Sequence, residues 1–356
     1  MSEKIFDLLI VGQGLAGINL SYDALSKGLD VHHIHFPTVG ESTKVAAGLI
    51  NPITGRRFVK SWLIDEVMPF AEKRYSDFGD LLKGNYISLL NIVRVFHQAE
   101  DENTWLAKSA DPYLAQFLLE KSEWSGGSEF HSKLKIPELI GELQNCFKIH
   151  LNDLQKDYHN YLETQELISY EMFDYNQCLK VADCFKYKNI SARTVIFADG
   201  WKVLDNPFFS NDPFSPAKGE LLIIKIPDLK LNKAYKKSSF ITPLGNDLYW
   251  VGATYEWQNY DTSPTEKMKS RILKHFHEMI DTPYEIVHHL TGIRPSSKDR
   301  RPVIGESSSH QGIFTFNGMG TKGSSLAPLF SKMLIEHIFE NKEIMEEVDI
   351  KRYITN

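Results

Sequence analysis

The chain has 356 residues, of which 42% are apolar and 24% are charged. This composition is typical of a soluble globular protein and excludes disordered, collagen-like and coiled-coil chains. With 40 Lys and Arg residues against 46 Asp and Glu residues, the formal net charge is −6. A mildly acidic chain without a basic tract is a poor candidate for a dedicated nucleic-acid binder.

The sequence also predicts the compartment. Cys146, Cys178 and Cys184 are its only cysteines, and they form no C-x-x-C pair. We therefore expect neither a disulfide framework nor a structural zinc site, and a reducing environment. No apolar run reaches about 18 residues, and the N-terminus lacks a signal-peptide pattern, so we expect a cytoplasmic protein without a membrane span.

The first 36 residues predict a βαβ unit. An apolar strand at 5–11 is followed by Gly12-Gln13-Gly14-Leu15-Ala16-Gly17, a helix that ends at Lys27-Gly28, and a second strand at 29–36. In a dinucleotide-binding turn, the first glycine allows the tight turn and the second lets the backbone approach a pyrophosphate. The third lets the helix pack against the sheet, and the helix N-terminus faces the phosphates. The alternative is a glycine turn without a ligand.

One element of this fingerprint is absent. The second strand normally ends in an acidic residue that binds the ribose hydroxyls, but His35 stands at that place. A neutral imidazole has one acceptor nitrogen, so we expect weaker cofactor retention, and a plain surface histidine is the alternative. His32 points to the opposite side of the strand from His33 and His35. Two histidines without further ligands do not predict a metal site.

The rest of the chain indicates a second domain. A proline-rich connection at 206–216 suggests a crossing between domains, and strand patterns follow at 221–224 and 248–251. The C-terminal segment has glycine-rich turns and then an amphipathic helix that we expect to start near Ser324.

Six segments, in this order, carry a resemblance to a known family. They are Glu41-Ser42-Thr43-Lys44-Val45-Ala46-Ala47-Gly48-Leu49-Ile50-Asn51-Pro52, 195–201, 252–256, Gly292-Ile293-Arg294-Pro295, 299–305 and 318–323. Nearly the whole chain resembles the FAD-dependent D-amino-acid oxidase and glycine oxidase superfamily, most specifically over 292–323. It is also similar to the C-terminal oxidase domain of the bifunctional tRNA wobble-uridine modification enzyme.

The resemblance implies an α/β fold with two discontinuous domains. A Rossmann-type FAD-binding domain with a parallel sheet would take residues 1–85, 165–205 and 290–356. An α+β substrate domain with a mixed or antiparallel sheet would take residues 86–164 and 206–289.

The resemblance also implies the residues that contact FAD. Ser42 and Thr43 fall at the pyrophosphate and Phe173 near the adenine, while small residues leave room for the isoalloxazine ring. The full predicted set is Gly12, Gly14, Leu15, Ala16, Gly17, His35, Ser42, Thr43, Ala46, Ala47, Gly48, Leu49, Phe173, Ala198, Gly200, Gly320, Thr321, Lys322, Gly323 and Ser324.

The C-terminal glycine turn allows two interpretations. The N-terminus of the helix that follows would offer N–H donors and positive potential to the reduced flavin. Alternatively, Ser324 and Ser325 cap an ordinary helix.

For the substrate, the resemblance implies that Arg294 binds a carboxylate, because a planar guanidinium fits it bidentately; a structural ion pair is the alternative. Phe240 occupies the place of a tyrosine found in glycine oxidases, which puts glycine-like substrates in doubt. Tyr255 is the candidate to compensate. Arg56-Arg57 and Lys60 could attract an anionic substrate or form a solvated turn.

The sequence therefore predicts an FAD-dependent oxidoreductase that oxidises the C–N bond of an amino acid or secondary amine by hydride transfer to flavin N5. O₂ or another acceptor would take the electrons. Two alternatives stay open: an oxidase of a modified tRNA uridine, and a flavin-binding protein without turnover. The sequence leaves the oligomeric state open.

Overall fold

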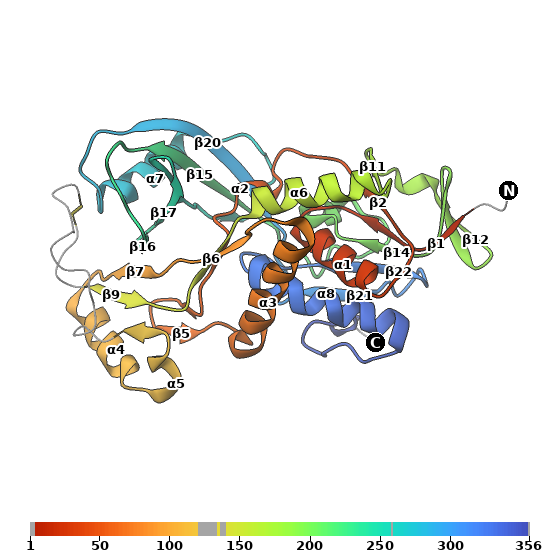
Figure 1. The fold of residues 1–356 in the computed structure, drawn as a ribbon, viewed down its shortest axis with the longest axis horizontal. Coiled ribbons are helices and arrows are strands. Elements are labelled where there is room, and N and C mark those ends of the chain that lie inside the picture. Colours follow the sequence, from red (N-terminus) through yellow and green to blue (C-terminus); the bar gives the residue numbers. More distant parts are fainter. Residues whose placement is uncertain (1–3, 120–133, 136–139, 258, 355–356) are drawn as a thin grey trace.

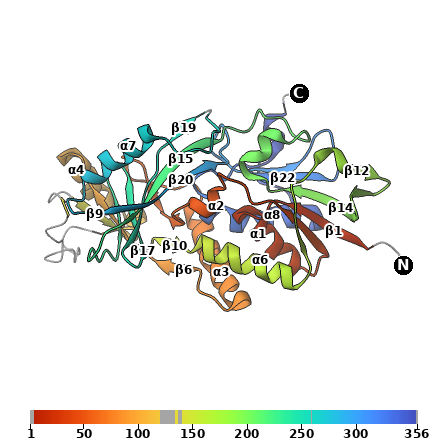
Figure 2. The same ribbon diagram turned by 90° about the horizontal axis from the view of Figure 1, so that it is seen from above.

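The computed structural model describes residues 4–119, 134–135, 140–257 and 259–354. The chain folds into two lobes side by side, and the strands near both chain ends belong to the same lobe (Figure 1). Each lobe is built on a large sheet, one eight-stranded and the other nine-stranded among the described residues. Seen from above, α6 runs along the lobe of β1 and β14, while β15, β17 and β20 form the other lobe (Figure 2).

The first sheet has a parallel centre. Its strands are β1 (Ile5–Val11), β2 (Val31–His35), β11 (Ile168–Tyr170), β12 (Cys178–Val181), β13 (Cys184–Tyr187), β14 (Ile190–Phe197), β21 (Val303–Glu306) and β22 (Ile313–Asn317). The order β11-β2-β1-β14-β22 is parallel throughout. This is the sheet that the βαβ pattern predicts, and its ligand site is expected at the carboxyl ends of the strands.

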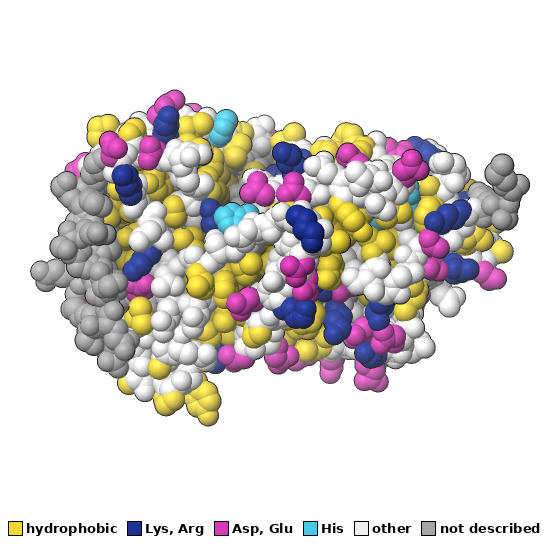
Figure 3. All heavy atoms as spheres, in the orientation of Figure 1, with side chains coloured by type: hydrophobic (Ala, Val, Ile, Leu, Met, Phe, Trp, Pro, Cys, Tyr) yellow, Lys and Arg dark blue, Asp and Glu magenta, His cyan; other side chains and the backbone are white. Residues whose placement is uncertain are grey.

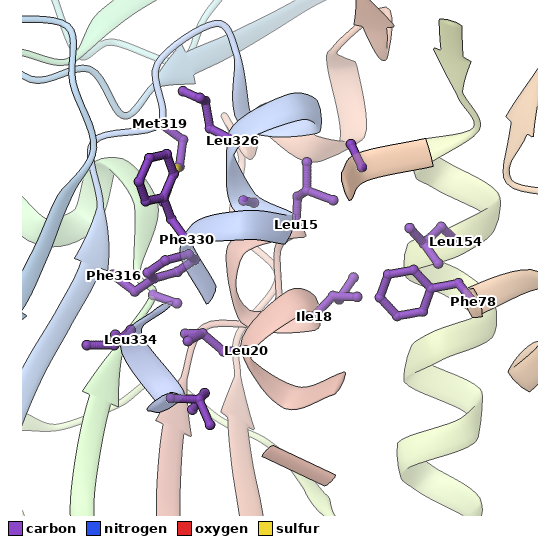
Figure 4. Close-up of a cluster of buried hydrophobic side chains, with 14 of the residues drawn as sticks. Leu15, Ile18, Leu20, Phe78, Leu154, Phe316, Met319, Leu326, Phe330 and Leu334 are labelled. Atoms are coloured by element: carbon purple, nitrogen blue, oxygen red, sulfur yellow. The ribbon is translucent and has the colours of Figure 1, made fainter. Parts of the chain in front are cut away.

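Helices form a layer on this sheet. They are α1 (Leu15–Ser26), α3 (Ile64–Leu82), α6 (Leu151–Thr164) and α8 (Gly323–Glu340). Their apolar faces meet in one buried cluster, because Leu15 and Ile18 of α1 pack with Phe78, Leu154 and residues of α8 (Figure 4). Burying such side chains stabilises each by roughly 1.5–3 kcal/mol relative to exposure, so this layer fixes the N-termini of α1 and α8.

Helix α6 lies in segment 86–164, which the sequence assigns to the substrate domain. Its residues Leu154, Tyr158 and Leu162 are buried in the same cluster as α1 and α3. The domain boundaries stay a prediction, and these contacts favour placing residues 151–164 with the first sheet.

The second sheet is mostly antiparallel. Its strands are β7 (Ile92–Val95), β8 (Leu118–Leu119), β9 (Ile140–Leu143), β15 (Ala217–Lys225), β16 (Ala234–Lys236), β17 (Phe240–Gly245), β18 (Leu248–Gly252), β19 (Glu256–Trp257) and β20 (Glu285–Arg294). Only the β16–β7 pair is parallel among the strand pairs described for this sheet. The predicted mixed α/β fold class, with a parallel sheet and a second mixed sheet, is confirmed.

The remaining elements are short or peripheral. They are α2 (Ser42–Val45), α4 (Ala99–Ser109), α5 (Pro112–Ala115) and α7 (Glu266–His277), the strands β3 (Leu49–Ile50), β6 (Ile87–Leu89) and β10 (Phe147–Ile149) of a small sheet, the pair β4 (Ile53–Thr54) and β5 (Val59–Lys60), and 3₁₀ helices at Tyr175–Gln177, Gly200–Asp205 and Ile350–Tyr353. The proline-rich segment 206–216 leads from the first sheet to β15 of the second, as its composition suggests. Over the described ranges, no helix is both long and apolar enough to span a bilayer.

Candidate functional site: a cavity between the two sheets

A cavity of about 840 Å³ lies where the two lobes meet. The first lobe contributes the β1–α1 turn, the end of β2 and the N-terminus of α8, and the second contributes residues of β15, β18 and β20. The cavity is thus at the carboxyl ends of the parallel strands, which is where open α/β sheets bind their ligands.

The three fingerprint glycines do different work. Gly12 has φ +99°, and a Cβ there would lie 2.3 Å from the Ala198 carbonyl oxygen. A Cβ on Gly17 would lie 1.9 Å from the Gly12 carbonyl oxygen, and Gly17 is not on the cavity wall. Both glycines are therefore required by close backbone packing. Gly14 faces the cavity, and its missing side chain leaves room for a ligand beside Thr43.

Two helix N-termini without side-chain caps open onto the cavity. Helix α1 begins after Gly14, and the Leu15 N–H donates to Thr43 Oγ1 at 3.0 Å. Helix α8 begins at Gly323 after Lys322, which provides no cap, and Ser325 Oγ donates to the Lys322 carbonyl rather than accepting a bond. The interpretation of Ser324 and Ser325 as caps is therefore wrong. The positive potential at both helix ends suits an anionic ligand.

His35 does not have the environment of a surface histidine. Its side chain is 4% exposed, and its Nδ1 accepts a bond from the Gln13 N–H at 3.3 Å. Burial, together with the positive charge of nearby groups, lowers the pKa of His35 to about 3, so the ring is neutral at neutral pH. With Nδ1 already bonded, the proton is assigned to Nε2, and the ring has no acceptor left for a ribose hydroxyl.

A carboxylate lies close to His35. Glu41 Oε1 lies 3.4 Å from His35 Nε2, and Lys44 Nζ lies 3.0 Å from Oε2. Glu41 lines the cavity and its side chain is 13% exposed. Sequence reasoning missed this residue because it looked for an acid at the end of β2, whereas Glu41 stands six positions further on, at the start of α2.

The loop after α2 forms another part of the wall. Ala46, Ala47, Gly48 and Leu49 all line the cavity. The loop is tied to the second sheet, because Trp250 Nε1 donates to the Val45 carbonyl at 2.8 Å. Small side chains in this position leave space for a flat ring.

Arg294, at the end of β20, lies on the cavity wall, and no acidic side chain of the described residues neutralises its positive charge. Its terminal nitrogens donate to the carbonyls of Lys218 (3.4 Å) and Thr254 (3.2 Å). No carboxylate among the described residues forms an ion pair with it. A Cβ on Gly219 would lie 2.4 Å from both terminal nitrogens, so the missing side chain lets the guanidinium lie flat on the sheet. Burial lowers the pKa of Arg294 from its usual value, and the group stays charged.

Tyr255 lies beside Arg294 and outside the cavity wall. Its ring centroid is 4.7 Å from Arg294 Cζ, its ring also packs on Trp257, and it is 39% exposed. The structure therefore brings it near the guanidinium as a stacking partner. Phe240, by contrast, lines the cavity.

A hydrogen-bonded carboxylate stabilises the turn after β14. Asp199 accepts hydrogen bonds from the side-chain amides of Asn206 (2.9 Å) and Asn317 (3.0 Å), and burial raises its pKa to about 6. This network holds the turn after β14 in place.

The other predicted cofactor residues also lie on the cavity wall. They are Phe173, Ala198, Gly200, Gly320, Thr321, Lys322, Gly323 and Ser324, with Leu15, Ala16 and Ser42 near the β1–α1 turn. Their contacts with a ligand stay predictions.

These features fit FAD. A dinucleotide needs phosphate donors, which the N-terminus of α1 and the Thr43 hydroxyl would provide, and a carboxylate for its ribose, which Glu41 would provide. The space beside Gly14 and along residues 46–49 is kept open by glycine and alanine. A volume of about 840 Å³ is within the range of cofactor sites.

Comparisons with known proteins agree with this site. A family model described as "FAD dependent oxidoreductase" matches residues 171–337. Glycine oxidase of Bacillus subtilis (strain 168) is 26% identical over 201 residues, which are 52% of this chain and 54% of that enzyme. The tRNA 5-methylaminomethyl-2-thiouridine biosynthesis bifunctional protein MnmC of Acinetobacter baylyi is 39% identical over 56 residues, 16% of this chain and 9% of that protein. The matched part thus spans about half, or less, of these relatives.

Solved structures share the fold over nearly the whole length. Glycine oxidase from Geobacillus kaustophilus superimposes with a TM-score of 0.77 at 18% identity, covering 98% of this chain and 99% of that one. Iminodiacetate oxidase from Chelativorans sp. BNC1 gives 0.74 at 17% identity, covering 97% and 98%. The resemblance predicted from the sequence is confirmed: the chain shares its fold with glycine oxidase from Geobacillus kaustophilus, and residues 171–337 match the family model of FAD-dependent oxidoreductases.

Proposed function

We propose that the protein oxidises the C–N bond of an amino acid or secondary amine that carries a carboxylate. One observation carries this proposal: the half-buried Arg294 guanidinium, hydrogen-bonded only to backbone carbonyls, faces the cavity that fits FAD. A cation that is partly removed from water and has no counter-ion is destabilised, and a bidentate carboxylate would both neutralise it and fix the orientation of the substrate.

The residues that would hold the cofactor fall into two groups. At one end, the N-terminus of α1, Ser42 and Thr43 would bind the pyrophosphate, and Glu41, which lies beside His35, would bind the ribose. At the other end, residues 46–49 and the N-terminus of α8 would surround the ring system. FAD, when bound, accepts the two electrons and the hydrogen that leave the carbon next to the amine nitrogen.

The side chains of the protein would bind the substrate, orient it and exclude water from the cavity. Arg294 would bind the substrate carboxylate, and Phe240 and Trp250 would exclude water from this end of the cavity. The amine must be neutral for its C–H bond to break, since its nitrogen lone pair forms the imine. Lys322 Nζ donates to Ser61 Oγ at 2.6 Å, and burial lowers the pKa of Lys322 to about 8. Together with the α8 N-terminus, this cation makes the local potential positive, which stabilises added negative charge.

The experiment is an anaerobic titration of the purified, FAD-loaded protein with a panel of amino acids and N-substituted amino acids. Bleaching of the visible flavin spectrum by a carboxylated amine, and not by the matching amine without a carboxylate, is the expected result. If no member of the panel bleaches a spectrum that dithionite does bleach, C–N oxidation of carboxylated amines is wrong and a flavin-binding role without turnover gains support.

A second candidate, oxidation of a modified uridine in tRNA, is favoured by the match to the MnmC protein of Acinetobacter baylyi. On the face drawn in Figure 3, however, basic and acidic side chains of the described residues intermingle over both lobes. Addition of unfractionated tRNA to the same anaerobic sample distinguishes this candidate, because only this function predicts bleaching by tRNA.

A further inference from the structure

A second cavity, of about 370 Å³, adjoins the main one. Lys236 lines both cavities, so the two share a wall. The second cavity is lined by Arg94 and Lys236, with Arg56 and Lys237 also basic, and by the rings of Phe58 and Phe96. The acid on its wall, among the described residues, is Asp101.

Arg94 and Lys236 are direct neighbours in the sheet. Strands β7 and β16 pair in parallel, and the register sets Lys236 opposite Arg94. Like charges in such a pair repel each other, and this costs stability unless something neutralises them. Asp101 offsets this repulsion only in part, because its Oδ2 also accepts a hydrogen bond from the His97 N–H at 2.9 Å.

The bonding capacity of the two cations is not used up. Arg94 Nη2 donates to the Gly55 carbonyl at 3.4 Å, while its buried Nε has no partner. Lys236 Nζ donates to the Ser238 carbonyl at 3.0 Å and lies 4.7 Å from the Phe240 ring centroid. No ion pair joins either cation to a carboxylate within the described ranges.

The protonation equilibria reflect this environment. Burial lowers the pKa of Arg94 to about 10 although Asp101 opposes the shift. Burial and the charge of Arg94 lower the pKa of Lys236 to about 8. A bound anion would raise both pKa values, because it neutralises the pair and accepts the unused donors.

We propose that Arg94 and Lys236 form a binding site for a second anionic group, a carboxylate or a phosphate, at the far end of the amine substrate. The description of the ligand as a substrate rests on the proposed function, whereas the anion site itself rests only on the geometry of the two cations. Lys236 lines both cavities, so the cation pair stands at the boundary between them. In this proposal the first carboxylate of the substrate lies at Arg294 and its second anionic group at the Arg94–Lys236 pair. The substrate class is then an amine with two acidic groups.

The first test measures binding and needs no turnover. The FAD-loaded protein is titrated with inorganic phosphate and, separately, with succinate at constant ionic strength, with chloride as the control anion. We expect saturable stabilisation against heat by at least one of the two anions. Arg94→Gln and Lys236→Gln should each lower the affinity for that anion at least tenfold, about 1.4 kcal/mol. Arg94→Lys keeps the charge and should weaken it less. The control is Lys180→Gln on β12, at the far end of the other lobe, which should match the wild type (Figure 1).

The second test uses the flavin. Pairs of amines that differ only in a distal carboxylate or phosphate are compared in anaerobic reduction, and the readout is the ratio of kcat/KM within a pair. We expect a ratio of at least about ten in the wild type and in Lys180→Gln, falling toward one in Arg94→Gln and Lys236→Gln. The carboxylate and phosphate arms identify which group the site prefers.

The outcomes separate this inference from the proposed function. If anions bind to the wild type and not to the two variants while no amine bleaches the flavin, the anion site stands and the proposed function falls. If amines bleach the flavin with ratios near one, and neither anion distinguishes the wild type from the variants, the second site is wrong and the two cations serve only the backbone carbonyls.

Discussion

The imidazole Nε2 of His35 lies 3.4 Å from Oε1 of Glu41, and both side chains lie on the wall of the main cavity. The end of β2 thus has no acid of its own, but a carboxylate from the next turn stands beside it. The neutral His35 ring accepts the Gln13 N–H at its Nδ1, and its Nε2 side lies next to the Glu41 carboxylate. We propose that Glu41 takes the place of the single acidic residue of the usual fingerprint.

Glu41→Ala should therefore weaken the binding of FAD. We expect the dissociation constant to rise about tenfold, or 1.4 kcal/mol, because a charged acceptor for the ribose hydroxyls is lost. Titration of apoprotein with FAD, followed by quenching of flavin fluorescence, measures it. Lys44→Gln removes the exposed partner of Glu41 and is the matched control, with a smaller expected effect. An unchanged affinity in Glu41→Ala would remove this residue from the site.

Arg294→Met should disrupt substrate binding and leave FAD in place. Loss of the bidentate contact should raise the KM of a carboxylated amine at least tenfold, about 1.4 kcal/mol, in anaerobic or oxygen-coupled assays. Arg294→Lys should fall between the wild type and Arg294→Met, since it keeps the charge without the fork. A wild-type KM in Arg294→Met would mean that the guanidinium serves only the carbonyls of Lys218 and Thr254.

Gly14 tests the space reserved beside the phosphates. A Cβ there would lie 3.1 Å from Thr43 Oγ1, the end of a side chain that can move, so Gly14→Ala should fold and bind FAD more weakly. Gly14→Val projects further into the cavity and should lose FAD altogether. Circular dichroism would report the fold and fluorescence titration the affinity. Full FAD affinity in Gly14→Val would contradict the predicted path of the pyrophosphate.

Stability in acid should depend on His33. Burial lowers its pKa to about 3, whereas the unfolded chain has a pKa near 6.5. The unfolded state therefore binds more protons below pH 6.5, and stability present above that pH is lost as the pH falls toward 3. At pH 5 the loss from this residue is about 2 kcal/mol.

Urea unfolding of the wild type and His33→Asn at pH 7 and pH 5 measures this loss. The asparagine amide keeps a donor for the Leu167 carbonyl, which His33 Nδ1 contacts at 2.8 Å. The variant should be less stable at pH 7 and lose less between the two pH values. Equal losses in both proteins would show that His33 is not held neutral by burial.

The parts of the fold that could be predicted from the sequence are those with local causes. The strand at 5–11 and the helix that ends at Lys27 follow from a buried apolar run and a glycine stop, and the structure has β1 at Ile5–Val11 and α1 at Leu15–Ser26. Helix α8 starts at Gly323, close to the predicted Ser324, but it has no side-chain cap, because the Ser325 hydroxyl donates to the Lys322 carbonyl.

The missed residues depend on contacts between distant segments. Glu41 reaches His35 only because the loop before α2 folds back over the end of β2, and Arg94 meets Lys236 only because β7 and β16 pair in parallel. Neither pairing has a spacing signal in the sequence. The position of α6 beside α1 likewise follows from long-range packing of Leu154, Tyr158 and Leu162, and not from its neighbours in the chain.

The most direct measurement for the whole account is a crystal structure of the protein grown with FAD. The account predicts electron density for one dinucleotide in the main cavity. Its pyrophosphate should lie at the N-terminus of α1, its ribose within hydrogen-bonding distance of Glu41, and its ring system between residues 46–49 and the start of α8. Density for FAD elsewhere, or a cavity closed by its own side chains in crystals saturated with FAD, would contradict it.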